Sequence, residues 1–171
     1  MPDLITHTLF VYPLKYRYQK AVIFILLGSI LPDLVGRIPG IIFPDSNPVG
    51  WYQTAVHTPF VLLLLTYIIS LLFPETQRKK VFMFILAGVA SHLFLDLFQK
   101  NLNFGYLWFF PISFSSFQIP LIWPDETIFL IPVFIVFNLI IFVVKNSMSF
   151  WNEAKSDLVK PSLTWRSDRI S

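Results

Sequence analysis

The chain alternates long apolar stretches with short polar segments. Within each stretch the apolar positions are continuous instead of alternating with polar ones, a pattern that favours helices over strands. A helix that crosses a lipid bilayer needs about 20 apolar residues, within a range of about 17–25. Two stretches approach this length, and two are shorter and need flanking residues or a thin bilayer. The four stretches cover residues 21–35, 59–73, 81–98 and 128–144.

A fifth, weaker apolar stretch covers Leu4–Leu14 and is interrupted by Thr6 and His7. It lacks the basic n-region and the small-residue cleavage site of a signal peptide, so we interpret it as a retained short helix. Backbone polar groups that face lipid must be satisfied within their own segment, which again favours helices. We therefore predict an all-α fold, an integral membrane helical bundle of four transmembrane helices plus a short N-terminal helix.

Helix-breaking residues separate the stretches. Pro32, inside the first stretch, is expected to kink or end the helix there and so to place Asp33 at a helix end. Asp125 is expected to act as the N-cap of the last helix. Further breaks are expected at Pro39-Gly40, at residues 44–48 and at Pro74.

Composition narrows the class of protein. Of the 171 residues, 55% are hydrophobic and 13% are charged, compared with about 25% charged in a typical soluble domain. An aromatic content of 18% excludes a disordered chain. The absence of cysteine excludes a disulfide framework and a cysteine-ligated zinc or iron–sulfur site. We divide the chain into a membrane-embedded helical metal-site domain, residues 1–145, and a polar basic tail, residues 146–171.

The basic residues are distributed asymmetrically along the chain. Eleven of the 13 lie at alternate ends of the apolar stretches, and only Arg37 and Lys100 lie at the other ends. By the positive-inside rule, the side of the membrane that carries these eleven basic residues is cytoplasmic, and the C-terminus lies on this side. Loops 36–56 and 99–124 then face outward. This accounts for the net charge of +3 without a nucleic-acid partner, because no basic face is interleaved with aromatic residues. We predict an integral membrane protein whose C-terminus is cytoplasmic.

Five ionisable residues lie in or beside the apolar stretches, where each costs about 2.5–3.5 kcal/mol to insert and is a functional candidate. They are His7, Asp33, His57, His92 and Asp96. His92 and Asp96 are four residues apart, so they share a helix face with Cβ atoms about 5–6 Å apart. Such a pair can bind a metal ion, orient a catalytic histidine or form a buried hydrogen bond that braces the bundle. Considered by itself, Asp33 can also be a carboxylate at a helix end that contacts water. His57, considered by itself, can be a capping residue at the membrane interface.

If the helices expected at 4–14 and 21–35 form a hairpin that turns at residues 15–20, His7 and Asp33 both lie toward the outer leaflet. His57 begins its helix from the outer loop, and His92 and Asp96 lie in the outer half of theirs, so all five groups are expected at one depth. Three imidazoles and two carboxylates suit a divalent transition metal, with zinc first and manganese or iron as alternatives. Magnesium and calcium prefer an oxygen-only shell. The set predicts one catalytic metal with a base to spare, or two metals that share ligands.

Neighbouring small residues are given structural roles. Ser29 and Ser91 are interpreted as packing residues or as hydrogen-bond donors to the ligands. Gly88 and Ser91 share a helix face that permits a homo-oligomer. Neither Gly-x-Ser-x-Gly nor His-Glu-x-x-His occurs, which argues against a serine hydrolase and against a zincin protease.

Several short motifs follow in order from the N-terminus. They are Thr6-His7, Gly28-Ser-x-Leu-Pro-Asp33, His57-Thr58, Gly88-x-x-Ser-His92-x-x-x-Asp96-Leu and Leu107-Trp-Phe-Phe-Pro-Ile-Ser113. In these motifs, over about residues 1–115, the chain resembles the YdjM-like family of membrane-bound metal-dependent hydrolases. That family is distantly similar to zinc-dependent phospholipases C and single-strand nucleases. The resemblance implies a metal-ligand set made of His7, Asp33, His57, His92 and Asp96.

The chain departs from the family pattern at two places. Members usually carry a second acidic residue two positions after the aspartate, where this chain has Val35. Many have a further histidine or arginine before the His-Thr pair, where this chain has Thr54-Ala-Val. These departures reduce the implied ligand set and favour a single metal. Asp45, in the expected outer loop, is a candidate replacement for the missing acid.

Three functions fit this sequence. The first is a metal-dependent hydrolase of a lipid or other membrane-associated phosphoester or ester, with a metal-activated water and with Asp96 or Asp33 as catalytic base or ligand. The second is a non-catalytic membrane protein with a structural metal site. The third is a small metal or proton transporter, which at this size would need to oligomerise. Membrane lipids are the expected partners.

Overall fold

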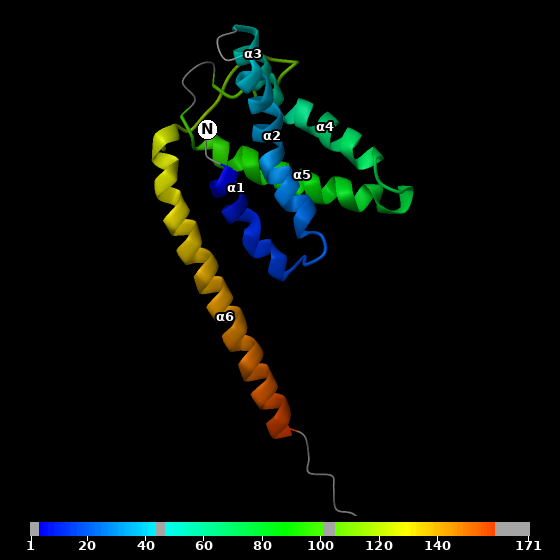
Figure 1. Cartoon of the computed structure of the whole chain (residues 1–171), viewed down its shortest axis with the longest axis vertical. Helices are drawn as coiled ribbons and strands as arrows, with labels where there is room; N and C mark the ends of the chain where they lie inside the picture. The colour runs from blue at the N-terminus through cyan, green and yellow to red at the C-terminus, as the bar shows by residue number, and fades with distance from the viewer. Residues whose placement is uncertain (1–3, 44–46, 101–104, 160–171) are drawn as a thin grey trace, which may run out of the picture.

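The computed structural model describes residues 4–43, 47–100 and 105–159, in which helices are joined by turns and by one long loop after α5 (Figure 1). Within these ranges the only strand-type pairing is an isolated bridge between Gln99 and Ile122. The all-α prediction is therefore confirmed. The elements are α1 (Leu4–Val11), η1 (Tyr12–Tyr16), α2 (Val22–Ile42), α3 (Asn47–Val56), α4 (Pro59–Leu71), α5 (Glu75–Leu97), η2 (Pro124–Phe129) and α6 (Leu130–Val159), where η marks a 3-10 helix.

Among the described residues, three helical stretches are long and apolar enough to cross a membrane. They are α2, α5 and Asp125–Ser149, which contains most of η2 and the first part of α6. Helix α4 is also apolar but has 13 residues, a length of about 20 Å, whereas the hydrocarbon core is about 30 Å thick. The short N-terminal helix is present as α1. The structure thus supports three membrane-spanning helices and one shorter apolar helix.

Helix α2 extends beyond the predicted end of the first stretch. It continues through Pro32 and Pro39 and ends at Ile42, so neither proline ends the helix. A proline removes one N–H from the helix, and α2 is supported on both sides of Pro32 by packing against α1, α3 and α5. Asp33 therefore lies inside a helix and not at a helix end. The predicted loop 36–56 is likewise wrong, because the end of α2 and the whole of α3 occupy this region.

The start of the last helical region also differs from the prediction. The 3-10 helix η2 begins at Pro124, so Asp125 lies in its first turn and is not the N-cap. Instead, the backbone N–H of Trp123 donates to the Glu126 carboxylate at 3.0 Å. Proline suits this first position because its missing N–H has no intrahelical partner there. Between α5 and η2, the described residues 105–123 contain no helix, in agreement with the predicted loop.

Helices α2 and α5 form the most extensive helix contact of the fold. Gly28 on α2 faces the backbone carbonyl of Ile85, and Gly88 on α5 faces the backbone carbonyl of Ile25. A Cβ atom at either glycine would overlap these oxygens, so only glycine allows the two backbones to approach this closely. Gly88, which the sequence analysis assigned to a face available for oligomerisation, is therefore used within the chain.

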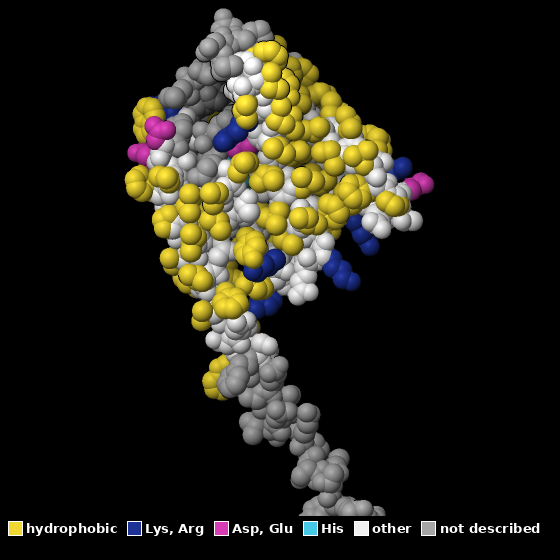
Figure 2. Space-filling model, viewed as in Figure 1, with side chains coloured by type: hydrophobic (Ala, Val, Ile, Leu, Met, Phe, Trp, Pro, Cys, Tyr) yellow, Lys and Arg dark blue, Asp and Glu magenta, His cyan; other side chains and the backbone are white. Residues whose placement is uncertain are grey.

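The buried core is small and lies between α2, α4 and α5. Much of the remaining apolar surface is exposed, and hydrophobic side chains cover most of the described face in Figure 2. In the stretch Asp125–Ser149, only 6% of the most apolar window is buried. Exposed apolar patches of this size fit a lipid environment. The buried core residues are Leu31, Leu62, Val81, Ile85, Val89 and Leu93.

Helix α6 is joined to the N-terminal elements by polar contacts. The Asn138 amide donates to the Leu9 carbonyl at 2.9 Å, and the Lys145 ammonium donates to the Tyr16 carbonyl at 3.2 Å. The helix then continues beyond residue 145, so no helix end marks the predicted domain boundary, which stays a prediction. The last part of the tail, residues 160–171, lies outside the described ranges. Most Lys and Arg side chains visible in Figure 2 lie along the lower edge of the apolar face.

We expect Gly28→Ala and Gly88→Ala each to lower the stability of the fold by about 1–3 kcal/mol, because the added methyl group overlaps backbone that cannot rotate away. The measurement is the thermal unfolding midpoint of the purified protein in detergent. Gly40→Ala, a glycine inside the same helix α2, is the matched control and is expected to be neutral or stabilising through helix propensity. An unchanged midpoint in both crossing variants would contradict the close approach.

Candidate metal centre

Five ionisable side chains from different parts of the chain meet in the interior. His7 comes from α1, Asp33 from the middle of α2, and His57 from the bend between α3 and α4. His92 and Asp96 lie in the last two turns of α5. Each of the five residues is at most 4% exposed. The structure thus brings together all five residues that the sequence analysis selected, although His7 and Asp96 are 89 residues apart in the sequence.

His92 has a defined tautomer because of the close crossing of α2 and α5. Its Nδ1 lies 2.7 Å from the backbone carbonyl of Ser29 and donates to it. In the neutral ring, Nε2 then carries the lone pair, and this atom lies 3.3 Å from Oδ2 of Asp96. Two acceptors therefore face each other in a buried site. Such a pair needs a cation between the two atoms, either a second proton on the imidazole or a metal ion.

His57 repeats this arrangement with the second carboxylate. Its Nδ1 donates to the Gln53 carbonyl at 2.8 Å, and its Nε2 lies 3.4 Å from Oδ1 of Asp33. The ring packs against α2 where a Cβ on Gly36 would come within 3.0 Å of its Cε1 atom. Thr58 then begins α4, because its hydroxyl accepts from the Val61 N–H at 3.5 Å. The bend that carries His57 is thus fixed on both sides.

His7 completes the cluster from α1. Its ring stacks on the ring of His92, with centroids 3.8 Å apart and an interplanar angle of 18°. Its Nε2 lies 3.6 Å from Oδ1 of Asp96, and neither ring nitrogen has a hydrogen-bond partner among the described residues. Burial and the neighbouring His92 lower the pKa of His7 to about 4. The ring is therefore neutral at pH 7 and keeps a lone pair for a ligand.

The ligand atoms form two groups that share His92. One group contains His7, His92 and Asp96, and the other contains Asp33, His57 and His92; within each group the atoms lie within 4.8 Å of one another. Around a tetrahedral zinc ion with bonds of about 2.1 Å, neighbouring ligand atoms are about 3.4 Å apart. The three nitrogen–oxygen distances of 3.3, 3.4 and 3.6 Å match this spacing. The residues present can therefore hold a divalent ion without large rearrangement.

The two carboxylates differ in their remaining contacts. Asp96 offers one oxygen to Nε2 of His7 and the other to Nε2 of His92, so it faces the Nε2 atoms of both stacked imidazoles. Asp33 offers Oδ1 to His57, whereas its Oδ2 lies 3.4 Å from the guanidinium of Arg37. The Arg37 side chain is 39% exposed. Of the two acids, Asp33 is therefore the one connected to the surface, through a cationic side chain.

Sequence reasoning missed three polar residues near this cluster. Arg37 was counted only as an outer charge, although its spacing of four residues from Asp33 predicts a contact. Gln99 follows Asp96 by three residues, is buried, and its amide has no hydrogen-bond partner within the described ranges. Tyr106 is buried in the loop after α5, where burial and then the charges of Asp96 and Asp33 raise its pKa well above its usual value. No local pattern marks Tyr106.

The serine side chains do not contact the ligands. The Ser29 hydroxyl donates to the Leu26 carbonyl at 2.9 Å, and the Ser91 hydroxyl donates to the Gly88 carbonyl at 2.6 Å. Ser29 instead orients His92 through its backbone oxygen. The interpretation of these hydroxyls as donors to the ligands is therefore wrong for the contacts seen, because each is taken by its own helix. Asp45, the candidate replacement acid, lies outside the described residues.

Comparison with known proteins gives one match. The chain has no significant match among curated proteins or among solved structures. The model of the family described as YdjM inner membrane protein matches residues 4–158, which include all five residues of the buried cluster and the described helices up to the next-to-last residue of α6. The apolar helices agree with a membrane protein. Because this match covers most of its length, the chain belongs to the YdjM inner membrane protein family.

Proposed function

We propose that this protein is a membrane-bound metal-dependent hydrolase that cleaves a phosphoester or ester carried by a membrane lipid. Its metal ligands in this proposal are His7, Asp33, His57, His92 and Asp96. A mixed nitrogen and oxygen shell of this kind favours zinc, with manganese or iron as alternatives. We propose that the site lies toward the outer leaflet of the bacterial inner membrane, which the family match and the sorting of basic residues along the sequence support.

One observation carries the proposal. In both His–Asp pairs, the histidine Nδ1 donates to a backbone carbonyl and the Nε2 lone pair faces a buried carboxylate. This is the arrangement by which proteins orient metal-ligating histidines, with the second ring nitrogen held by a neighbouring acceptor. A histidine that only braced a bundle would need one such partner. Here two His–Asp pairs lie together with His7, whose ring nitrogens have no hydrogen-bond partner among the described residues.

The side chains have distinct roles in this proposal. When bound, a divalent transition metal lowers the pKa of water and polarises a phosphoryl or carbonyl oxygen. Asp96 holds the two stacked imidazoles in place from α5. Asp33 accepts a proton from the attacking water, because only one of its oxygens faces a histidine. Arg37, next to Asp33, binds the anionic oxygens of a phosphoester, which favours a phosphoester over a carboxylic ester.

Metal binding is the first test. His92→Ala removes the ligand shared by both groups, so we expect its affinity for zinc, measured by equilibrium dialysis and elemental analysis, to fall by at least about tenfold. Ser91→Ala is the matched control, because its hydroxyl bonds only within α5, and it should bind zinc like the wild type. If His92→Ala and the wild type bind equal zinc and equal manganese, the ligand assignment is wrong.

Turnover is the second test. We expect the zinc-loaded protein to release a water-soluble product from vesicles of phosphatidylethanolamine and phosphatidylglycerol, and a chelator to stop the release. Asp33→Asn should lower kcat by a factor of about 10²–10⁴, the usual contribution of general-base catalysis. Asp125→Asn changes an exposed acid of η2 and is the matched control. Zinc binding without turnover would support a structural metal site, and ion flux into proteoliposomes would support a transporter.

A further inference from the structure

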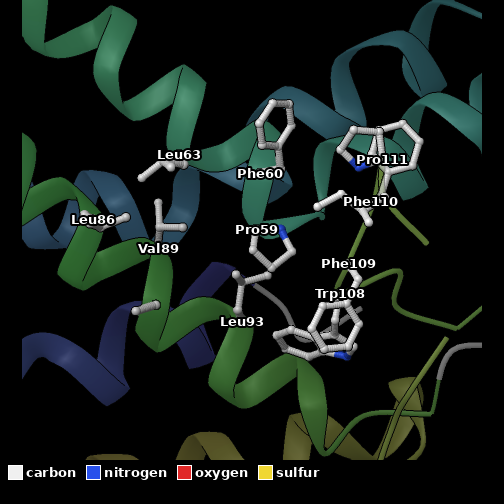
Figure 3. Close-up of a pocket in the computed structure, with 12 residues that line it drawn as sticks. Pro59, Phe60, Leu63, Leu86, Val89, Leu93, Trp108, Phe109, Phe110 and Pro111 are labelled. Carbon is white, nitrogen blue, oxygen red and sulfur yellow. The ribbon is translucent and has the colours of Figure 1, made fainter. Parts of the chain in front are cut away.

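An apolar cavity of about 520 Å³ lies beside the His/Asp cluster, between α4, α5 and the loop that follows α5. Leu63, Leu86 and Val89 lie at one end of it, Pro59 and Leu93 lie near its middle, and aromatic residues of the loop close the other end (Figure 3). Pockets that hold small ligands usually measure about 300–1,000 Å³. The cavity is therefore large enough for a ligand, and its lining offers only apolar side chains.

The cavity and the metal ligands use neighbouring faces of the same elements. On α5, Val89 and Leu93 line the cavity, while His92 lies one residue away on the adjacent face. On the other wall, Pro59 follows His57 by two residues at the start of α4. The middle of the cavity is therefore lined by Pro59 and Leu93, which follow His57 by two positions and His92 by one. The loop wall is also fixed, because the Trp108 indole N–H donates to the Phe117 carbonyl at 2.7 Å.

The cavity opens onto the apolar outer surface of the protein. Two of its lining side chains on α4, Phe60 and Leu63, are 46% and 42% exposed. Because the protein belongs to an inner membrane protein family, we expect lipid acyl chains to surround this apolar surface. A second apolar cavity of about 470 Å³ shares Pro59, Trp108 and Phe109 with the first and continues toward the end of α5. The lining is therefore continuous with the lipid-facing surface.

We infer that the cavity between α4, α5 and Trp108–Ile112 binds one acyl chain of a phospholipid and presents its polar head to the His/Asp cluster. This inference rests on the proposed function for the identity of the reacting lipid. The acyl chain enters from the bilayer between Phe60 and Leu63, and its transfer into the cavity is driven by burial against the apolar lining. Arg37, whose guanidinium lies 3.4 Å from Oδ2 of Asp33, then binds the phosphate. The substrate class is accordingly a phospholipid with at least one long acyl chain.

The test uses the full-length protein in detergent with a trace of phosphatidylethanolamine that carries a diazirine on one acyl chain. After illumination, mass spectrometry locates the labelled residues. We expect labels on residues 86–93 and 108–112. Ala90→Trp fills the cavity from α5 and should lower labelling by about tenfold, because each methylene group kept out of the cavity weakens binding about fourfold. Ala87→Trp, at an exposed position outside the lining, should leave labelling unchanged.

A second pair of variants guards against misfolding. Leu63→Trp enters the cavity from α4, whereas Leu64→Trp adds the same group to an exposed position outside the lining. Equal labelling in the blocked and control variants, or labels spread evenly over α6 as expected for bulk lipid, would overturn the inference. Zinc binding measured on the same samples separates the two proposals. Labelling lost in Ala90→Trp with zinc retained supports the cavity, and a wild type that binds lipid but no zinc contradicts only the proposed function.

Discussion

The backbones of α2 and α5 approach each other so closely at Gly28 and Gly88 that neither position has room for a Cβ atom. This approach has a direct chemical consequence. Ser29, the residue after Gly28, presents its carbonyl oxygen to the Nδ1 atom of His92, which lies one helical turn after Gly88. The contact fixes the tautomer of the histidine shared by both ligand groups. The geometry of the cluster therefore depends on helix packing. The two glycines affect it indirectly, by allowing the backbones of α2 and α5 to approach each other.

The cluster in turn explains how five ionisable groups can be buried among apolar helices. An isolated buried carboxylate is costly unless it is paired or coordinates a metal. Here Asp96 faces the Nε2 atoms of His7 and His92, and Asp33 contacts His57 and Arg37. Because two of the histidines turn a lone pair toward a carboxylate, each contact requires a proton or a metal ion between the two atoms. A metal ion at this position would stabilise the buried cluster and, in the proposed function, would also supply the hydrolytic chemistry.

The cluster has a cationic side chain and an apolar cavity among its neighbours. Arg37 connects Asp33 to the surface with a positive charge. Close in sequence to His57 and His92, residues of α4, α5 and the loop around Trp108 line an apolar cavity. A phospholipid has the same division into an anionic head and an apolar chain. The short α4 contributes both to the cavity and, through the bend before it, to the position of His57. A shorter apolar helix beside longer spans is therefore part of the proposed site.

The sequence by itself determined the all-α class, the membrane character and the five clustered residues, because these follow from continuous apolar stretches and from ionisable groups that such stretches rarely contain. It was wrong in placing Asp33 at a helix end, because α2 continues through Pro32 to Ile42 and packs against α1, α3 and α5. It also missed Tyr106, whose position depends on how a loop without periodicity folds back over α5. Only the tertiary structure decided the histidine tautomers and the apolar cavity. Both depend on backbone atoms and helix faces brought together from distant parts of the chain, and no local pattern records such contacts.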